Sequence, residues 1–219
     1  MAIAFFDLDR TLICINSGQL WVRRELALGH LSRRKAAQAA VWIAQYSLGL
    51  ARLEETVERA IEHIRGSSGQ DFDSRTESFY QRQVRPAVRP GALAAIDAHR
   101  RSRDRLVMLT SSSNYLADRA ARDLGIEEVW CNRLEVGADG LHTGRTVDGV
   151  CFGQGKLTAA QRAAERHGTM LSACTFYTDS YADLPVMDAV GRPVAVNPDL
   201  RLRRKARRRG WEIVDWGRP

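Results

Sequence analysis

A short apolar run at the start of the chain, Ile3–Phe6, is followed directly by the carboxylates of Asp7 and Asp9. An apolar run of this kind predicts a strand buried on both faces, as in a parallel sheet with helices on both sides. Open α/β sheets bind ligands at the edge where the carboxyl ends of the strands lie, so the two carboxylates predict a site there. Because Asp-x-Asp also marks ordinary turns, this prediction depends on partner groups further along the chain.

A second apolar run, residues 106–109, ends at Thr110 and the neighbouring Ser111 and Ser112. A helix is predicted to follow over residues 115–124. Hydroxyl and backbone N–H groups at such a junction favour a bound anion, because the helix dipole is positive at its N-terminus. The alternative is a serine run that only caps the helix. We expect the junction to bind phosphate, with the backbone N–H groups of the two serines available to it.

A lysine and a second pair of aspartates follow in chain order. Lys156 begins a predicted helix in a chain whose other basic residues are nearly all arginine, although a surface lysine is the alternative. Asp179 and Asp183 follow a short apolar strand, residues 174–178. Aspartates gathered at one sheet edge repel one another unless a cation joins them. Mg²⁺ fits this position, because it prefers oxygen ligands and accepts water and phosphate as further ligands.

These groups, taken in order, resemble the four motifs of the haloacid dehalogenase (HAD) superfamily. The motifs correspond to Asp-x-Asp-x-Thr at residues 7–11, then Thr110, Lys156, and the pair Asp179 and Asp183. The resemblance is to subfamily IB, which includes the phosphoserine phosphatases. A nucleotide P-loop is not expected, since its complete glycine-lysine pattern is absent.

The resemblance implies a role for each residue. Asp7 would be the nucleophile, Asp9 the general acid and base, and Thr110 and Lys156 the catalytic ligands of the phosphoryl group. Mg²⁺ is the implied cofactor, and its implied ligands are Asp7, Asp9 through its backbone carbonyl, and Asp179. Asp183, the fourth residue of the implied metal site, would bind the ion through water or orient the other ligands. The residues expected to contact phosphate or substrate are Thr11, Ser111, Ser112 and Asn16.

Between Asn16 and Arg89 the apolar periodicity is helical, and no strand is expected. The expected helices are 18–28, 32–50, 53–64 and 72–84. A helical insertion after the first strand resembles the C1 cap of subfamily IB, which closes over the site; a subdomain with only a packing role is the alternative. We therefore expect an α/β fold, a Rossmann-like parallel sheet flanked by helices, with an all-helical C1 cap inserted after strand 1. The core would comprise residues 1–15 and 90–219, and the cap residues 16–89.

The rest of the core is expected to continue the alternation of helices and strands. Helices are expected over residues 90–103 and 157–166. Two further helices are expected, one that ends at residue 190 and one that begins at about residue 198. A β-hairpin is expected over residues 134–143, and the last two strands over residues 193–196 and 211–214.

Composition narrows the kinds of protein further. The net charge of +7 allows attraction to anionic substrates. The Arg-rich stretch 201–209 has no aromatic set beside it, so a solvated helix face is favoured and nucleic acid is not an expected partner.

The four cysteines lie far apart, which favours free thiols in a reducing compartment over a zinc or redox motif. The most apolar stretch, 36–50, is shorter than the roughly 20 residues of a membrane span, and no signal peptide is expected, so the predicted location is cytoplasmic.

The expected function is Mg²⁺-dependent hydrolysis of a small-molecule phosphomonoester through an aspartyl-phosphate. Dehalogenation is not expected, because Asp9 supplies a proton that a leaving halide does not need. Two other classes stay open: a phosphatase acting on polynucleotide ends, and a non-catalytic binding protein on the HAD fold. Phosphoserine phosphatases carry a glutamate at the position of Asn16, so phosphoserine is expected to be a poor substrate. Arg10 replaces a usually small residue and either reaches an anionic substrate or points to solvent.

Overall fold

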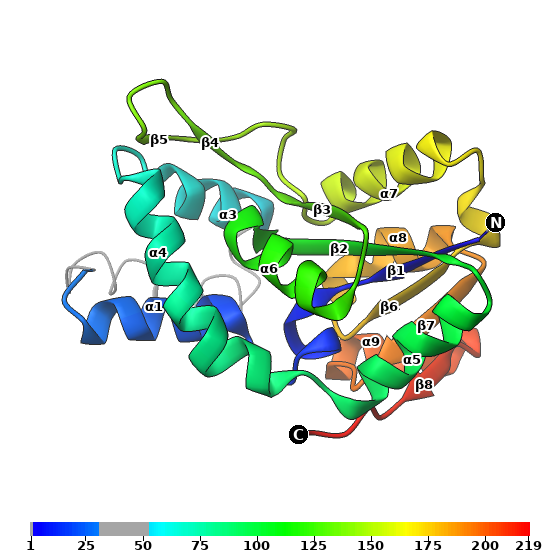
Figure 1. Ribbon diagram of the computed structural model, residues 1–219. Coiled ribbons are helices and arrows are strands. Elements are labelled where there is room, and N and C mark those ends of the chain that lie inside the picture. Colours follow the sequence, from blue (N-terminus) through cyan, green and yellow to red (C-terminus); the bar gives the residue numbers. More distant parts are fainter. Residues whose placement is uncertain (1, 31–52) are drawn as a thin grey trace.

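The computed structural model of the protein describes residues 2–30 and 53–219, and a six-stranded sheet lies at its centre (Figure 1). Neighbouring strands are parallel throughout, in the order β3-β2-β1-β6-β7-β8. The strands are β1 (Ile3–Phe6), β2 (Arg105–Ser113), β3 (Glu128–Asn132), β6 (Thr175–Thr178), β7 (Arg192–Val196) and β8 (Glu212–Val214). The predicted α/β fold with a parallel sheet is confirmed.

The first strand lies in the middle of the sheet because its side chains are apolar on both faces. Ala4 and Phe6 pack into one hydrophobic core, and Ile3 and Phe5 pack into the other. This follows from the alternation of side chains along a strand. β1 pairs with β2 on one side and with β6 on the other. Asp7 therefore leaves the sheet between the ends of two other strands.

Helices cover both faces of the sheet, as strands buried on both faces require. α5 (Pro90–Arg101) and α6 (Asn114–Leu124) pack against one core. α7 (Gln154–Arg166), α8 (Leu184–Ala189) and α9 (Leu200–Arg209) pack against the other core. Within the described ranges, no helix is long and apolar enough to cross a membrane.

The described part of the insertion is helical, in agreement with the prediction. It contains α1 (Ser17–Ala27), α3 (Leu53–Glu62) and α4 (Gly69–Phe79), which lie beside the carboxyl end of the sheet (Figure 1). Within its described residues there is no strand, only single bridge pairs at Ser68 and Val88. These helices stand where a cap could cover the end of β1.

Two details of the insertion differ from the prediction or lie beyond it. α4 begins at Gly69, three residues before the expected start, because the Ser68 hydroxyl accepts a hydrogen bond from the Asp71 N–H at 3.2 Å and caps the helix. The helix expected over residues 32–50 lies outside the described residues. The division of the chain at residues 16 and 89 stays a prediction.

A β-hairpin of the core reaches the insertion. β4 (Leu134–Val136) and β5 (His142–Thr146) are antiparallel and form the expected hairpin. Leu141 forms a bridge pair with Ser68, and Nδ1 of the buried His142 lies 3.1 Å from the Ser67 hydroxyl. The hairpin therefore holds the loop that precedes α4, a contact that the sequence pattern does not predict.

The edge strand β3 is absent from the sequence-based prediction. Most of its residues are only partly buried, and it begins and ends with the polar residues Glu128 and Asn132, so no continuous apolar run marks it. Its presence also explains why β2 extends past the predicted end at Thr110. Ser113 pairs with Asn132 after a register shift, which keeps the serine-rich segment in the sheet.

Candidate active site

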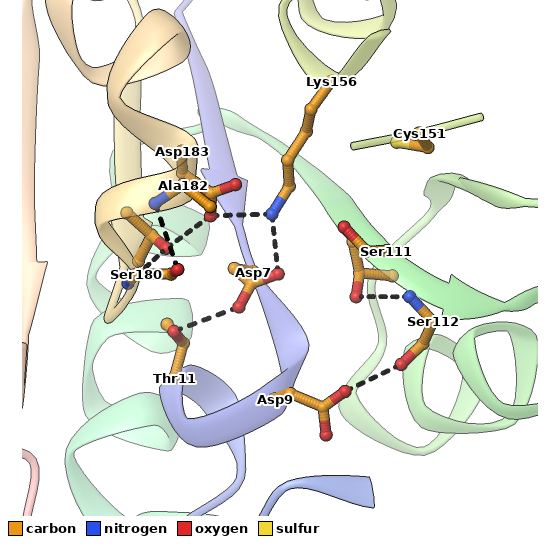
Figure 2. A network of polar contacts seen from close by, with 12 residues as sticks. Asp7, Asp9, Thr11, Ser111, Ser112, Cys151, Lys156, Ser180, Ala182 and Asp183 are labelled. Carbon is orange, nitrogen blue, oxygen red and sulfur yellow. Dashed lines mark hydrogen bonds and ion pairs between the residues drawn. The ribbon is translucent and has the colours of Figure 1, made fainter. Parts of the chain in front are cut away.

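The side chains of Asp7, Lys156 and Asp183 meet at the carboxyl end of the sheet (Figure 2). The Lys156 ammonium donates to Asp7 Oδ1 and to Asp183 Oδ2, each at 2.8 Å. Asp7 directly follows β1, Asp183 lies in the turn after β6, and Lys156 lies in the first turn of α7. Because Lys156 is 1% exposed, its charge requires such anionic partners. Three separate segments of the chain thus meet at one point.

The Thr11 hydroxyl joins Asp7 to the segment of Asp179. It accepts a hydrogen bond from the Asp179 N–H at 3.0 Å and donates to Asp7 Oδ2 at 3.3 Å, with Asp179 Oδ1 at 3.5 Å. Thr11 is fully buried, and its hydroxyl contacts these two residues. Thr11 thus positions the two carboxylates, and its expected contact with phosphate stays a prediction.

Asp9 is held at the start of the first insertion helix. Its Oδ1 accepts a hydrogen bond from the N–H of Ser17, the first residue of α1, at 2.6 Å. Its Oδ2 accepts a hydrogen bond from the Ser112 hydroxyl at 3.0 Å. Burial raises the pKa of Asp9 above its usual value, although these hydrogen bonds oppose the rise. A partly exposed carboxyl group with a raised pKa suits a residue that both gives and takes a proton.

The end of β2 brings Thr110, Ser111 and Ser112 next to this cluster. Thr110 is buried, and its Oγ1 accepts a hydrogen bond from the Ser112 N–H at 3.2 Å. That N–H was expected to be available to phosphate, so the structure differs from the prediction here. The carbonyl of Ser111 accepts a hydrogen bond from the Asn132 amide at 2.7 Å. The end of β2 is thus held by hydrogen bonds of its own and by Asn132, and Thr110 is its buried residue.

Carboxylates outnumber the ammonium group at this site. Burial raises the pKa of Asp7 to about 6, although Lys156 opposes the rise. Burial, followed by the charges of Asp7 and Asp183, raises the pKa of Asp179 to about 8. Burial alone would lower the pKa of Lys156, but Asp183 and Asp7 raise it above its usual value. The pKa values of the carboxyl groups rise because they are buried and because one ammonium cannot balance the charge of several carboxylates. The ammonium of Lys156 stays protonated beside them.

The donors beside Asp7 suit a hard cation. In the described part of the chain, no three His, Cys, Asp or Glu side chains are arranged to hold a metal ion by themselves. Asp183 is instead bound by Lys156 and by the Thr178 hydroxyl, which donates to it at 2.6 Å. Mg²⁺ commonly binds through one or two carboxylates, with water and phosphate as its other ligands. Asp7 and Asp179, both beside Thr11, fit this pattern, and Asp183 fits the role of orienting the lysine.

Asn16 and Arg10 flank the turn that carries Asp9. Asn16 caps α1, because its Oδ1 accepts a hydrogen bond from the Gln19 N–H at 2.9 Å. Arg10 is exposed and has a left-handed backbone with φ of 57°, which costs a non-glycine residue of order 1 kcal/mol. Burial dominates the raised pKa of Asp179, and the charge of Arg10 opposes the rise.

Three residues outside the predicted motifs also contact the site. Ser17 donates its N–H to Asp9, Thr178 donates its hydroxyl to Asp183, and Asn132 donates to the carbonyl of Ser111. Thr178 and Asn132 are each the last residue of a strand, and Ser17 is the first residue of a helix. Their position at the ends of strands and helices could have marked them as site residues in the sequence, because ligands bind at the carboxyl ends of the strands in such sheets.

Comparison with known proteins decides the family. A model of the family described as haloacid dehalogenase-like hydrolase matches residues 4–188, a range that includes every site residue described above. The chain belongs to this family. Phosphoserine phosphatase SerB1 of Mycobacterium tuberculosis is 33% identical over 221 residues, which cover 98% of this chain and 71% of that protein. Histidinol-phosphatase of Neisseria meningitidis is 27% identical over 218 residues, which cover 98% of both proteins.

A solved structure agrees with this assignment. The crystal structure of a protein of unknown function from Bordetella pertussis is similar to this HAD hydrolase with a TM-score of 0.88 and 26% identity, over 99% of both chains. The family match confirms the predicted membership of the HAD superfamily. The family match, together with relatives that carry phosphatase names, supports an enzyme of the phosphatase class.

Proposed function

We propose that this HAD hydrolase is an Mg²⁺-dependent phosphatase that hydrolyses a small-molecule phosphomonoester through an aspartyl-phosphate on Asp7. The observation that carries the proposal is the 2.8 Å contact of the Lys156 ammonium with Asp7, in a cluster that also contains Asp9 and Asp179. A fixed ammonium beside the attacking carboxylate reduces its repulsion from an anionic phosphate. This arrangement supports nucleophilic attack on phosphorus more than simple binding.

The proposed reaction has two half-reactions, and Asp9 moves the proton in both. First, the Asp7 carboxylate attacks phosphorus while Asp9 gives a proton to the leaving oxygen, which its raised pKa makes available. Asp9 then takes a proton from a water molecule, which hydrolyses the aspartyl-phosphate and releases inorganic phosphate. Lys156 and the Thr110 hydroxyl would hold the remaining phosphoryl oxygens. Mg²⁺, held by Asp7, Asp179 and the Asp9 carbonyl, would screen charge on the transferring group.

The substrate class is inferred from the relatives and from Asn16. Relatives named phosphoserine phosphatase and histidinol-phosphatase support a small phosphorylated metabolite. Asn16 is uncharged and its side-chain oxygen caps α1, so it offers no anionic partner to the ammonium of phosphoserine. Phosphoserine is therefore still expected to be a poor substrate, and the same argument applies to histidinol phosphate if its ammonium lies beside Asn16. All four cysteines are free, which agrees with the cytoplasmic location that we propose.

Phosphate release from a panel of small esters, measured with Mg²⁺ and with EDTA, tests this function. We expect turnover of at least one ester with Mg²⁺ and its loss in EDTA. Asp7→Asn keeps the side-chain volume but removes the nucleophile, so it should lower kcat by roughly a thousandfold or more. Asp97→Asn is the matched control, because Asp97 is an exposed residue of α5 paired with Arg100.

The outcomes separate the competing classes. Full activity of Asp7→Asn would remove the aspartyl-phosphate mechanism. Faster phosphate release from DNA or RNA ends than from every small ester would favour the polynucleotide class. The absence of turnover, together with tight binding of a phosphate ester, would favour a binding protein on the HAD fold.

A further inference from the structure

Asn132, the last residue of the edge strand β3, connects two segments of the active site through its side-chain amide. Its Nδ2 donates to the carbonyl of Ser111, and its Oδ1 accepts a hydrogen bond from the Cys151 N–H, both at 2.7 Å. The residue is 3% exposed, so these bonds lie out of water. Both ends of one buried amide are therefore used by chain segments that Figure 2 shows near Asp7 and Lys156.

Each of the two contacts is close to an expected phosphate ligand. Ser111 directly follows Thr110 in the chain. Cys151 lies in the loop of residues 147–153 that leads into α7. Next to it, the carbonyl of Phe152 accepts hydrogen bonds from the Gly155 N–H at 2.8 Å and from the Lys156 N–H at 3.3 Å. Because this loop is bonded to itself, the position of Cys151 fixes where the helix of Lys156 begins.

We propose that Asn132 is a positioning residue for phosphate binding, which sets the Thr110 segment at a fixed distance from Lys156. The inference rests on the proposed function, since it assumes that these two groups hold the phosphoryl oxygens. Its own bonds go to Ser111 and Cys151, whereas the expected metal ligands Asp7 and Asp179 follow other strands, β1 and β6. Loss of Asn132 should therefore weaken phosphate binding and leave the binding of Mg²⁺ alone intact.

A purely structural role predicts a different result. If Asn132 only satisfied two buried backbone groups, its loss would lower stability without a selective effect on any ligand. Asn197 offers the matched control for that case. Its Nδ2 donates to Asp215 at 2.6 Å and its Oδ1 accepts a hydrogen bond from the Trp216 N–H at 3.0 Å, so its amide is also used at both ends, although by one segment. Its partners lie in the C-terminal segment.

The experiment compares Asn132→Ala, Asn132→Leu and Asn197→Ala with the wild-type full chain. Asn132→Leu keeps most of the side-chain volume, so it tests the same loss of hydrogen bonds if the alanine variant folds poorly. Calorimetry measures the binding of Mg²⁺ alone and of inorganic phosphate in the presence of Mg²⁺. Steady-state hydrolysis of the best ester gives kcat, and thermal melting gives stability.

For both Asn132 variants we expect phosphate affinity and kcat each to fall about tenfold or more, because small misplacements of binding groups are costly. Mg²⁺ affinity should stay within about twofold. Asn197→Ala should lower the melting temperature and leave phosphate affinity unchanged. Folded Asn132 variants with wild-type phosphate affinity, or with an equal loss of Mg²⁺ affinity, would overturn the inference alone. A wild-type protein that binds no phosphate would overturn the proposed function, and this inference with it.

Discussion

At the scale of single residues, the buried lysine determines the charge of the site. Lys156 is one of three lysines in a chain that otherwise uses arginine. An ammonium is a compact charge on a flexible stem, so it fits between two carboxylates where a planar guanidinium would need more room. Lys156 contacts Asp7 and Asp183 at 2.8 Å each, in a place almost without solvent. Removal of this cation leaves two buried carboxylates without their counter-charge.

We predict that Lys156→Met lowers the free energy of unfolding by about 3–5 kcal/mol in EDTA at neutral pH, the usual cost of breaking a buried ion pair from one side. Urea denaturation measures this change. Lys205→Met is the matched control, since Lys205 is a partly buried lysine of α9, and it should change stability by less than about 0.5 kcal/mol. Similar stabilities of the two variants would contradict the prediction. Lys156→Met should also weaken binding of inorganic phosphate.

Arg10 gives a second prediction at this scale, because its exposed charge acts on the site through Asp179. Glycine readily adopts the φ of 57° found here, so Arg10→Gly removes the charge and keeps the turn. At low salt, Mg²⁺ should bind about two- to fivefold more tightly and phosphate more weakly by a similar factor, the usual scale for one exposed charge. Both effects should shrink at high salt.

Arg103→Gly is the control for the Arg10 variant. Arg103 has nearly the same backbone angle, φ of 58°, and lies in the turn between α5 and β2. Calorimetric titrations of both variants with Mg²⁺ and with phosphate should show opposite changes in the two affinities for Arg10→Gly only. If both affinities change in the same direction, Arg10 acts through the backbone turn and not through its charge.

At the scale of elements, the start of α7 is fixed by close backbone packing. Gly155 is the second residue of this helix, and a Cβ atom added there would lie 2.0 Å from the carbonyl oxygen of Val150. At that distance the Cβ atom and the Val150 carbonyl would clash, so the backbone of the loop would have to move. Lys156 is the next residue, so its side chain would be displaced as well. Gly18 is the second residue of α1, but its nearest neighbour would be Asn16 Oδ1 at 3.7 Å, an ordinary contact.

The two glycines therefore predict opposite effects of one substitution. Gly155→Ala should lower the free energy of unfolding by about 1–3 kcal/mol through overpacking, and should reduce kcat because the lysine is displaced. Gly18→Ala should raise stability by about 0.4–1 kcal/mol, since alanine restricts the unfolded chain. Denaturation and ester hydrolysis measure both variants. Equal stability of the two variants would show that the Val150 contact does not constrain the loop.

At the scale of the whole molecule, the fold concentrates carboxylates at one sheet edge and thereby stores repulsion that a cation can relieve. Asp7, Asp179 and Asp183 come from the ends of two adjacent strands. The pKa of Asp179 is raised from 3.8 to about 8, so the folded protein holds a proton that the unfolded chain has lost above about pH 4. As pH rises toward 8, this group therefore makes the metal-free folded state less stable.

We predict that Asp179→Asn gains stability relative to wild type in EDTA between pH 6 and pH 8, by roughly 1–3 kcal/mol over this interval. The comparison between variants matters, because buried His142, whose pKa burial lowers, contributes the opposite trend to both proteins. Stabilisation of the wild type by Mg²⁺ should increase over the same range, since the ion displaces the proton. A difference that stays constant with pH, measured by urea denaturation, would contradict this account.

The order of chemical groups along the chain could be predicted from the sequence because it depends on local patterns. Apolar runs that end in aspartate or threonine marked β1, β2 and β6, and helical periodicity marked the described part of the insertion. The same reasoning failed for β3, whose partly exposed residues form no continuous apolar run. It also missed the contact of Thr11 with Asp179, which lies 168 residues later in the chain.

Local patterns along the chain indicate which side chains lie at strand ends, because apolar runs and periodicity involve neighbouring residues only. Which of these ends meet depends on the packed fold, which brings Lys156 to Asp7 and Asp183, and Asn132 to Ser111 and Cys151. Such pairings depend on strand order and on the exclusion of water around groups far apart in the chain. A buried polar group must find a partner, and only the packed fold determines which partner is within reach.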